Sequence, residues 1–177
     1  MQGEIQMSPM YDPEEVKPMV TELTNVGISS LTTPEEVDTA LLQTPGTTLL
    51  VINSVCGCAA GNCRPGVTLA LQNKKIPDNL FTVFAGMDTE AVERARGIMK
   101  DVSPSSPNIA IFEDGALIGI LERRHIERMS AADVSDALVK VFDEHCTREG
   151  PSVAPEVFEN NEHEDRCGSS IPLYQGD

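Results

Sequence analysis

The apolar residues of this sequence fall into two kinds of pattern: continuous runs, and series that recur every three or four positions. The continuous runs are rich in β-branched residues and occupy 47–53, 81–85, 108–112 and 116–121. Such runs are typical of strands buried within a sheet. Apolar residues recur at helical spacing in the segments 12–27, 33–45, 67–73, 88–99 and 130–142. Each of these segments is expected to form an amphipathic helix.

Capping and turn residues separate these elements. Asp12-Pro13-Glu14-Glu15 and Thr33-Pro34-Glu35-Glu36 each combine an N-capping side chain, a proline at the first helical position and acidic residues in the first turn. Gly27 and Pro45-Gly46 follow these two helices and are expected to end them. The pair Asp114-Gly115, between the last two strand runs, predicts a tight hairpin turn.

The order of elements indicates the fold class. After the two N-terminal helices the predicted order is strand, helix, strand, helix, strand, strand, helix. A strand–helix–strand unit makes parallel strands, and the hairpin then adds an antiparallel one. We therefore expect an α/β, thioredoxin-like fold, with a central four-stranded mixed sheet flanked by helices and an N-terminal two-helix extension. This domain is expected to span residues 1–146. Residues 147–177 are acidic and rich in Pro, Asn, Glu and Ser, and are expected to form a disordered or loosely docked tail.

Charge and cysteine content limit the classes of function. The chain has 177 residues and a formal net charge of -15, which disfavours nucleic acid and anionic membranes as partners. The first residues lack the basic and apolar regions of a signal peptide, and no apolar run has the length of a membrane span. We therefore expect a cytoplasmic protein with reduced thiols. In that compartment, clustered cysteines are redox-active or bind metal more often than they form structural disulfides.

Cys56, Gly57 and Cys58 directly follow the strand run 47–53 and precede a helical segment. The carboxyl end of such a strand is where sites form in open α/β sheets, and a helix N-terminus favours a thiolate. A disulfide between Cys56 and Cys58 would close a very small strained ring, which glycine accommodates best, and would be easily reduced. The pair therefore indicates a reversible redox couple, or a nucleophile with a helper thiol.

Three other interpretations of the cysteine cluster remain open. Cys56, Cys58 and Cys63 could be three ligands of a zinc site, with Cys146, Cys167 or a histidine as the fourth. A Cys–His hydrolase would need one of the chain's three histidines beside a cysteine, although none lies in a recognisable motif. The cysteines could also be small, inert, buried residues.

A second segment resembles part of a redox site. Pro107, Phe112 and Gly115 match the spacing of the cis-proline segment of the thioredoxin superfamily. The resemblance implies a cis peptide bond between Ser106 and Pro107 that faces the cysteines and leaves the neighbouring backbone free to pair with an extended substrate. The alternative is an ordinary loop proline.

The block Asn-Ser-Val-Cys-Gly-Cys-Ala-Ala-Gly-x-x-Arg-Pro at 53–65 resembles the bacilliredoxin family of thioredoxin-like proteins. Supporting similarities lie at 83–86, 104–107, 124–127 and 142–146, so that the resemblance covers residues 10–146. It implies a thiol–disulfide oxidoreductase without a bound cofactor, which uses bacillithiol as co-substrate. Its partners would be S-bacillithiolated or disulfide-containing proteins and a low-molecular-weight thiol. Cys56 would attack the mixed disulfide and take the bacillithiol, and Cys58 or a second small thiol would release it.

The chain departs from this family pattern at Cys63 and in the tail that carries Cys167. Either thiol could replace Cys58 in the resolving step, although Cys63 is interpreted first as a buried helix residue. His125 is interpreted as a surface or helix-capping residue rather than a catalytic base. A catalytically idle adaptor that uses the acidic surface is the remaining hypothesis, and it predicts that Cys56→Ser leaves cellular function intact.

Overall fold

The computed structural model describes residues 7–176 of the chain, so residues 1–6 and 177 of the expected domain and tail lie outside the described residues. A five-stranded sheet forms the centre, in the order β1-β4-β2-β5-β6. Strands β1, β4 and β2 are parallel, and β5 and β6 add antiparallel pairs at the other side. The strand bounds are Ser29–Ser30 (β1), Thr47–Asn53 (β2), Asn79–Phe84 (β4), Asn108–Glu113 (β5) and Ala116–Leu121 (β6).

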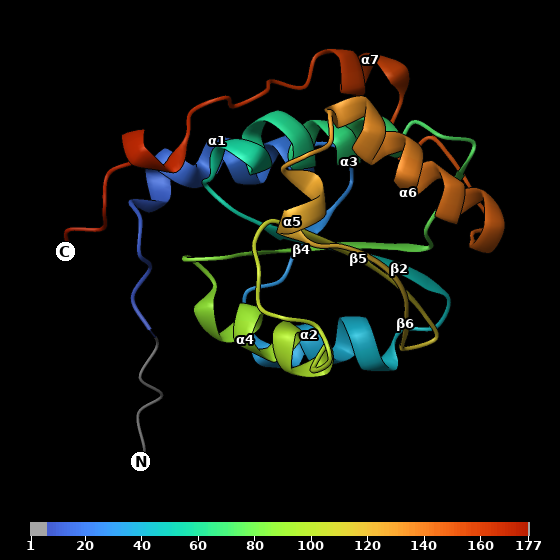
Figure 1. Cartoon of the computed structure of the whole chain (residues 1–177), viewed down its shortest axis with the longest axis horizontal. Helices are drawn as coiled ribbons and strands as arrows, with labels where there is room; N and C mark the ends of the chain where they lie inside the picture. The colour runs from blue at the N-terminus through green and yellow to red at the C-terminus, as the bar shows by residue number, and fades with distance from the viewer. Residues whose placement is uncertain (1–6, 177) are drawn as a thin grey trace.

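Helices cover both faces of this sheet (Figure 1). One face carries α1 (Pro13–Thr24), α3 (Arg64–Ala70) and α6 (Ala131–His145), and the other carries α2 (Pro34–Asp38) and α4 (Thr89–Ile98). The short elements include β3 (Lys75–Ile76), α5 (Arg123–Ile126), β7 (Arg148–Glu149) and α7 (Pro155–Glu159). The prediction of a thioredoxin-like mixed sheet between helices is confirmed, but the sheet has five strands instead of the expected four, because the short strand β1 pairs with β4.

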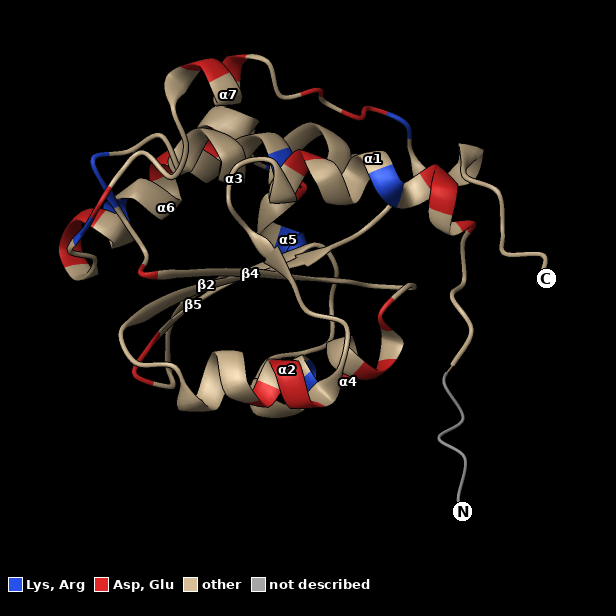
Figure 2. Ribbon diagram, turned by 180° about the vertical axis from the view of Figure 1, so that it is seen from behind, with Lys and Arg blue, Asp and Glu red and all other residues tan. Residues whose placement is uncertain are grey.

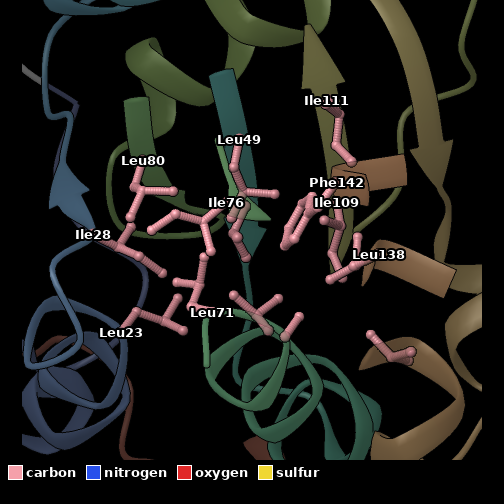
Figure 3. Close-up of a cluster of buried hydrophobic side chains, with 14 of the residues drawn as sticks. Leu23, Ile28, Leu49, Leu71, Ile76, Leu80, Ile109, Ile111, Leu138 and Phe142 are labelled. Carbon is pink, nitrogen blue, oxygen red and sulfur yellow. The ribbon is translucent and has the colours of Figure 1, made fainter. Parts of the chain in front are cut away.

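Strand β2 joins the two halves of the core. Every one of its residues is buried, and successive side chains point to opposite faces of the sheet. Leu49 and Val51 pack with the helices α1, α3 and α6, whereas Leu50 and Ile52 pack with α2 and α4. Figure 3 shows the first of these clusters, which contains Leu49, Ile109, Leu71 and Phe142. The continuous apolar run thus reflects burial on both faces.

Several local predictions are confirmed. The Asp12 carboxylate accepts a hydrogen bond from the N–H of Glu14, and Thr33 forms a capping box with Glu36. Asp114 and Gly115 have φ angles of 48° and 84° in the hairpin turn between β5 and β6. Asp88 directly precedes α4, but its Oδ2 accepts a hydrogen bond from the N–H of Phe84 instead of capping the helix.

The helix after the cysteines begins earlier than predicted. Helical backbone starts at Gly57, passes through a π-helical stretch at Ala59–Cys63 and continues as α3 to Ala70. The sequence predicted only 67–73, because Pro65 and the small residues before it mask the apolar spacing. Pro65 is the second residue of α3, directly after the π-helical stretch, and has no N–H to donate.

The C-terminal segment, which was expected to be disordered or loosely docked, lies against the domain. In Figure 1 it runs back over the helices α3 and α1. Ile171 is only 5% exposed and packs with Val16 and Met19 of α1. The hydroxyl of Ser152 donates to the carbonyl of Val26 at 2.7 Å. The composition did not indicate these particular contacts, because most of them are polar. Within residues 7–176, no helix combines the length and apolar character that a membrane crossing requires.

Candidate active site

The loop that carries Cys56 is fixed by polar side chains at the end of β2. Asn53 donates from Nδ2 to the carbonyl of Met19 at 3.0 Å and accepts from the N–H of Ser54 at 2.8 Å. The hydroxyl of Ser54 then accepts a hydrogen bond from the N–H of Cys56 at 3.2 Å. Because Asn53 and Ser54 are buried, this chain of bonds fixes where Cys56 leaves the sheet.

The thiols of Cys56 and Cys58 are in contact. Their Sγ atoms lie 3.0 Å apart, both cysteines are free and both are half-buried. The N–H of Ala59, in the first turn of the following helix, points at the Cys56 sulfur at 3.4 Å. The structure therefore brings together the glycine-spaced pair and a helix N-terminus, as the sequence indicated.

The two thiols differ in acidity. Burial raises the pKa of Cys56, but hydrogen bonds from Cys58, Ser54 and the backbone of Ala59 and the charge of Arg123 outweigh it, so that its pKa is lowered. For Cys58, burial and the bond to Cys56 raise the pKa to about 11. At neutral pH Cys58 is therefore a protonated hydrogen-bond donor to the Cys56 sulfur. Since the thiolate is the nucleophile, this asymmetry favours Cys56 as the attacking group.

A cavity of about 580 Å³ opens beside the first thiol, and its lining includes Cys56, Gly57, Ser106 and Arg123. The peptide bond between Ser106 and Pro107 is cis, as the resemblance implied. Pro107 itself is buried, so that Ser106 is the residue of this segment that reaches the cavity. Cys58 does not line it.

Arg123 is a site residue that sequence reasoning missed. It begins α5, lines the cavity, and donates from Nη1 to the carbonyl of Ser106 at 3.3 Å. Figure 2 shows α5 as a basic element in a molecule where Asp and Glu are spread over α2, α7 and the end of α6. A positive charge directly after the strand β6 was visible in the sequence, but its distance from Cys56 depends on the fold.

None of the three histidines supports a Cys–His hydrolase. His125 accepts a hydrogen bond from the N–H of Glu122 at 3.0 Å and caps α5, as expected for a capping residue. His145 pairs with Glu113, and His163 contacts the carboxylate of Glu22. The residues that line the cavity include no histidine.

The other cysteines are dispersed. Cys63 is fully buried in the core between α3 and the sheet, and burial raises its pKa strongly. Cys146 is buried, whereas Cys167 is exposed. In the described part of the chain, no group of three or more potential ligands gathers at one point. The zinc interpretation, which needs Cys56, Cys58 and Cys63 together, therefore has no support from the geometry.

A buried arginine connects the active-site loop to its surroundings. Arg64 is 0% exposed, and its Nε lies 2.5 Å from Oε2 of Glu22 on α1. Its other nitrogens donate to the carbonyl of Ser54 at 2.8 Å and to the carbonyl of Glu164 at 3.0 Å. A buried guanidinium needs such partners to offset its desolvation. Arg64 thus holds the Cys56 loop, α1 and the C-terminal segment in one network.

Comparison with known proteins identifies the family. A family described as disulphide isomerase matches residues 11–146. A bacilliredoxin of Cytophaga hutchinsonii is 52% identical over 135 residues, which cover 76% of this chain and 99% of that protein. The chain belongs to the bacilliredoxin family. A bacilliredoxin of Salinibacter ruber is 48% identical, with 80% of this chain and 84% of that protein covered. Among solved structures, mitochondrial thioredoxin 3 of Saccharomyces cerevisiae aligns with a TM-score of 0.46 and 21% identity, over 68% of this chain and 98% of that one.

Membership of the bacilliredoxin family confirms the sequence-based prediction of a thioredoxin-like thiol–disulfide oxidoreductase. The matched region, 11–146, agrees with the extent of the resemblance found in the sequence. The segment after residue 146, which carries Arg166 and Cys167, lies beyond the match.

Proposed function

We propose that the protein removes bacillithiol from mixed disulfides on cytosolic proteins, with Cys56 as the nucleophile. The observation that carries this proposal is the asymmetric thiol pair: Cys56 has a lowered pKa and borders an open cavity, while Cys58 donates to it from 3.0 Å. Family membership supports the choice of bacillithiol as the co-substrate.

In the first step the Cys56 thiolate attacks the bacillithiol sulfur of the mixed disulfide. A new disulfide forms between Cys56 and bacillithiol, the old one breaks, and the target protein leaves as a thiolate that takes a proton from water. The hydrogen bonds from Cys58 and Ala59 favour the thiolate form of the attacking sulfur. The side chains of Arg96 and Arg123 in the cavity wall favour the anionic sulfur that develops as the leaving group departs.

In the second step a thiol releases the bacillithiol from Cys56. Cys58 is the resolving thiol within the motif, and a second low-molecular-weight thiol is the alternative. Attack by Cys58 would form the Cys56–Cys58 disulfide across Gly57 and free bacillithiol. The ring is small and strained, so that external thiols reduce it readily and return the enzyme to its starting state.

The cavity gives the target protein a place to bind. Gly57 and Ser106 border it beside Cys56, and we place the substrate backbone along this edge, with its modified cysteine over the Cys56 sulfur. S-bacillithiolated proteins, and other proteins with an exposed disulfide, are the partners of this chemistry.

Mass spectrometry with an S-bacillithiolated protein tests the proposal. The wild type and Cys58→Ser should both strip the substrate, and rapid acid quenching of Cys58→Ser should trap bacillithiol on Cys56. Cys56→Ser should strip nothing. If Cys56→Ser removes bacillithiol as fast as the wild type, or if the trapped adduct lies on another cysteine, the assignment of Cys56 is wrong.

A further inference from the structure

The C-terminal segment beyond the family match forms part of the active-site cavity. Cys167, Gly168 and Ser169 line the cavity together with Cys56 and Gly57. Gly168 approaches the catalytic loop so closely that a Cβ there would lie 2.8 Å from Cγ2 of Val55. The segment therefore lies against the loop that carries the nucleophile.

Contacts on both sides of Cys167 hold it in this position. Before it, Arg166 donates to the carboxylate of Glu15 at 2.7 Å and to the carbonyl of Glu15 at 3.1 Å, while Arg64 holds the carbonyl of Glu164. After it, Ile171 is buried between α1 and the strand β4, with Val55 as a further neighbour. A thiol held from both sides stays close to the cavity, although its own side chain is exposed.

We propose that Cys167 is a second resolving thiol, which attacks the Cys56–bacillithiol disulfide and forms a Cys56–Cys167 disulfide. The proposal rests on the proposed function of Cys56. Its geometric basis is the position of the Cys167 Cβ, which lies 4.0 Å from where a Cβ on Gly57 would be. Cys167 therefore lies beside the residue that follows Cys56, and both cysteines line the same cavity.

The chemistry of the two candidate resolving thiols also differs. The Cys167 sulfur contacts the hydroxyl of Ser169 at 2.9 Å, and this bond together with nearby backbone N–H groups lowers the pKa of Cys167. The pKa of Cys58, in contrast, is raised to about 11. A larger fraction of Cys167 is therefore thiolate at neutral pH. A Cys56–Cys167 bond also avoids the small ring that a Cys56–Cys58 bond would close.

The proposed step balances without a further oxidant. The Cys167 thiolate attacks the Cys56 sulfur of the mixed disulfide, a bond forms between Cys56 and Cys167, and the bond to bacillithiol breaks. Bacillithiol leaves as a thiolate and takes a proton from water. A dithiol reductant, or two molecules of a low-molecular-weight thiol, then reduces the new disulfide and is itself oxidised.

A single-turnover experiment on the full chain tests this step. Cys58→Ser and Cys58→Ser/Cys167→Ser are each mixed with one equivalent of S-bacillithiolated protein, quenched in acid over time and mapped by mass spectrometry. Both variants should first carry bacillithiol on Cys56, which reports the proposed function alone. In Cys58→Ser the adduct should then disappear as a Cys56–Cys167 disulfide appears, roughly tenfold or more faster than in the double variant because the second thiol is tethered nearby.

Two controls separate this route from others. Cys58→Ser/Cys63→Ala should release bacillithiol as fast as Cys58→Ser, because Cys63 is buried in the core. The release rate should be independent of protein concentration, as expected for attack within one chain. Release that scales with concentration, or that survives unchanged in Cys58→Ser/Cys167→Ser, overturns the proposal.

The outcomes also distinguish this inference from the proposed function. An adduct that forms on Cys56 and persists equally in both variants overturns the role of Cys167 and leaves the role of Cys56 standing. If no adduct forms, the proposed function fails, and a titration of Cys58→Ser in dithiothreitol redox buffer tests the thiol pair directly. Formation of a Cys56–Cys167 disulfide in that titration supports the pairing, and its absence overturns it.

Discussion

The guanidinium of Arg64 and the carboxylate of Glu22 form an ion pair that is buried on both sides, with 2.5 Å between Nε and Oε2. The arginine comes from the start of α3 and the glutamate from α1. The same arginine donates to the backbone carbonyls of Ser54, in the loop that leads to Cys56, and of Glu164, in the C-terminal segment. Three separate parts of the chain therefore depend on one charged side chain.

Glu22→Gln should lower the free energy of unfolding by about 3–5 kcal/mol, because it leaves a buried guanidinium without its counter-charge. Urea titration followed by circular dichroism measures the change. Arg94→Ala is the matched control, since Arg94 and Asp38 form an ion pair whose side chains are 41% and 36% exposed. An exposed pair contributes about 1 kcal/mol or less. Equal losses in the two variants would contradict the structural role given to Arg64.

A close helix contact gives a second prediction about stability. Gly66 of α3 faces α6, where a Cβ would lie 2.6 Å from Cβ of Val134 and 3.0 Å from the carbonyl of Ala131. Gly66→Ala should therefore push the helices apart and lower the free energy of unfolding by about 1–3 kcal/mol. Gly61→Ala is the control, because nothing lies within 4 Å of its Cβ position. It should be neutral or stabilising, as alanine favours helix over glycine. A neutral Gly66→Ala would show that α3 and α6 do not pack this closely.

The pattern of apolar residues was enough to predict the helices and strands that have long or fully buried apolar faces. Strand β2 was predictable because all its side chains are buried, and α6 because Val134, Leu138 and Phe142 recur on one face below a Ser130 cap. Strand β1 and helix α5 were not predicted, since Ser29–Ser30 and Arg123–Ile126 are too short to show a period. Strand β1 is defined by its pairing with β4, and α5 by the capping box of Glu122.

The parts of the site formed by residues close together in the sequence could be predicted. The spacing of Cys56 and Cys58 indicated a redox pair, and the Ser106–Pro107 segment indicated the second side of the cavity. Arg123 and Cys167 reach the cavity only through the fold. The tail composition pointed to disorder because its contacts, such as Arg166 with Glu15, are polar and leave no apolar pattern in the sequence.

Arg123→Gln should raise the pKa of Cys56, because the positive charge that favours the thiolate is removed. Cys56 alkylation at neutral pH should become slower, and the difference from the wild type should shrink as salt is added, since the Arg123 side chain is 48% exposed. Peptide-resolved alkylation rates across pH measure the effect.

Arg124→Gln is the matched control for the charge of Arg123. Its side chain is 74% exposed, pairs with Glu122 and does not line the cavity. Arg123→Lys should retain most of the wild-type rate of Cys56 alkylation, because lysine keeps the positive charge. It should lose only the hydrogen bond of the planar guanidinium to the Ser106 carbonyl. If Cys56 alkylation slowed equally in Arg123→Gln and Arg124→Gln, the net charge of the protein, rather than the position of Arg123, would set the pKa of Cys56.

Cys58→Ala should raise the pKa of Cys56 above its wild-type value, because it removes the hydrogen bond that contributes most to stabilising the thiolate. The sign follows from which form the bond favours: a donor to the sulfur stabilises the thiolate, so that its loss moves the pKa upward. The pH at which Cys56 alkylation reaches half its maximal rate should therefore shift to higher values. Cys167→Ala should leave that midpoint in place, since Cys167 is not among the groups that set the pKa of Cys56. An unchanged midpoint in Cys58→Ala would show that the helix N-terminus and Arg123 activate Cys56 without help from its neighbouring thiol.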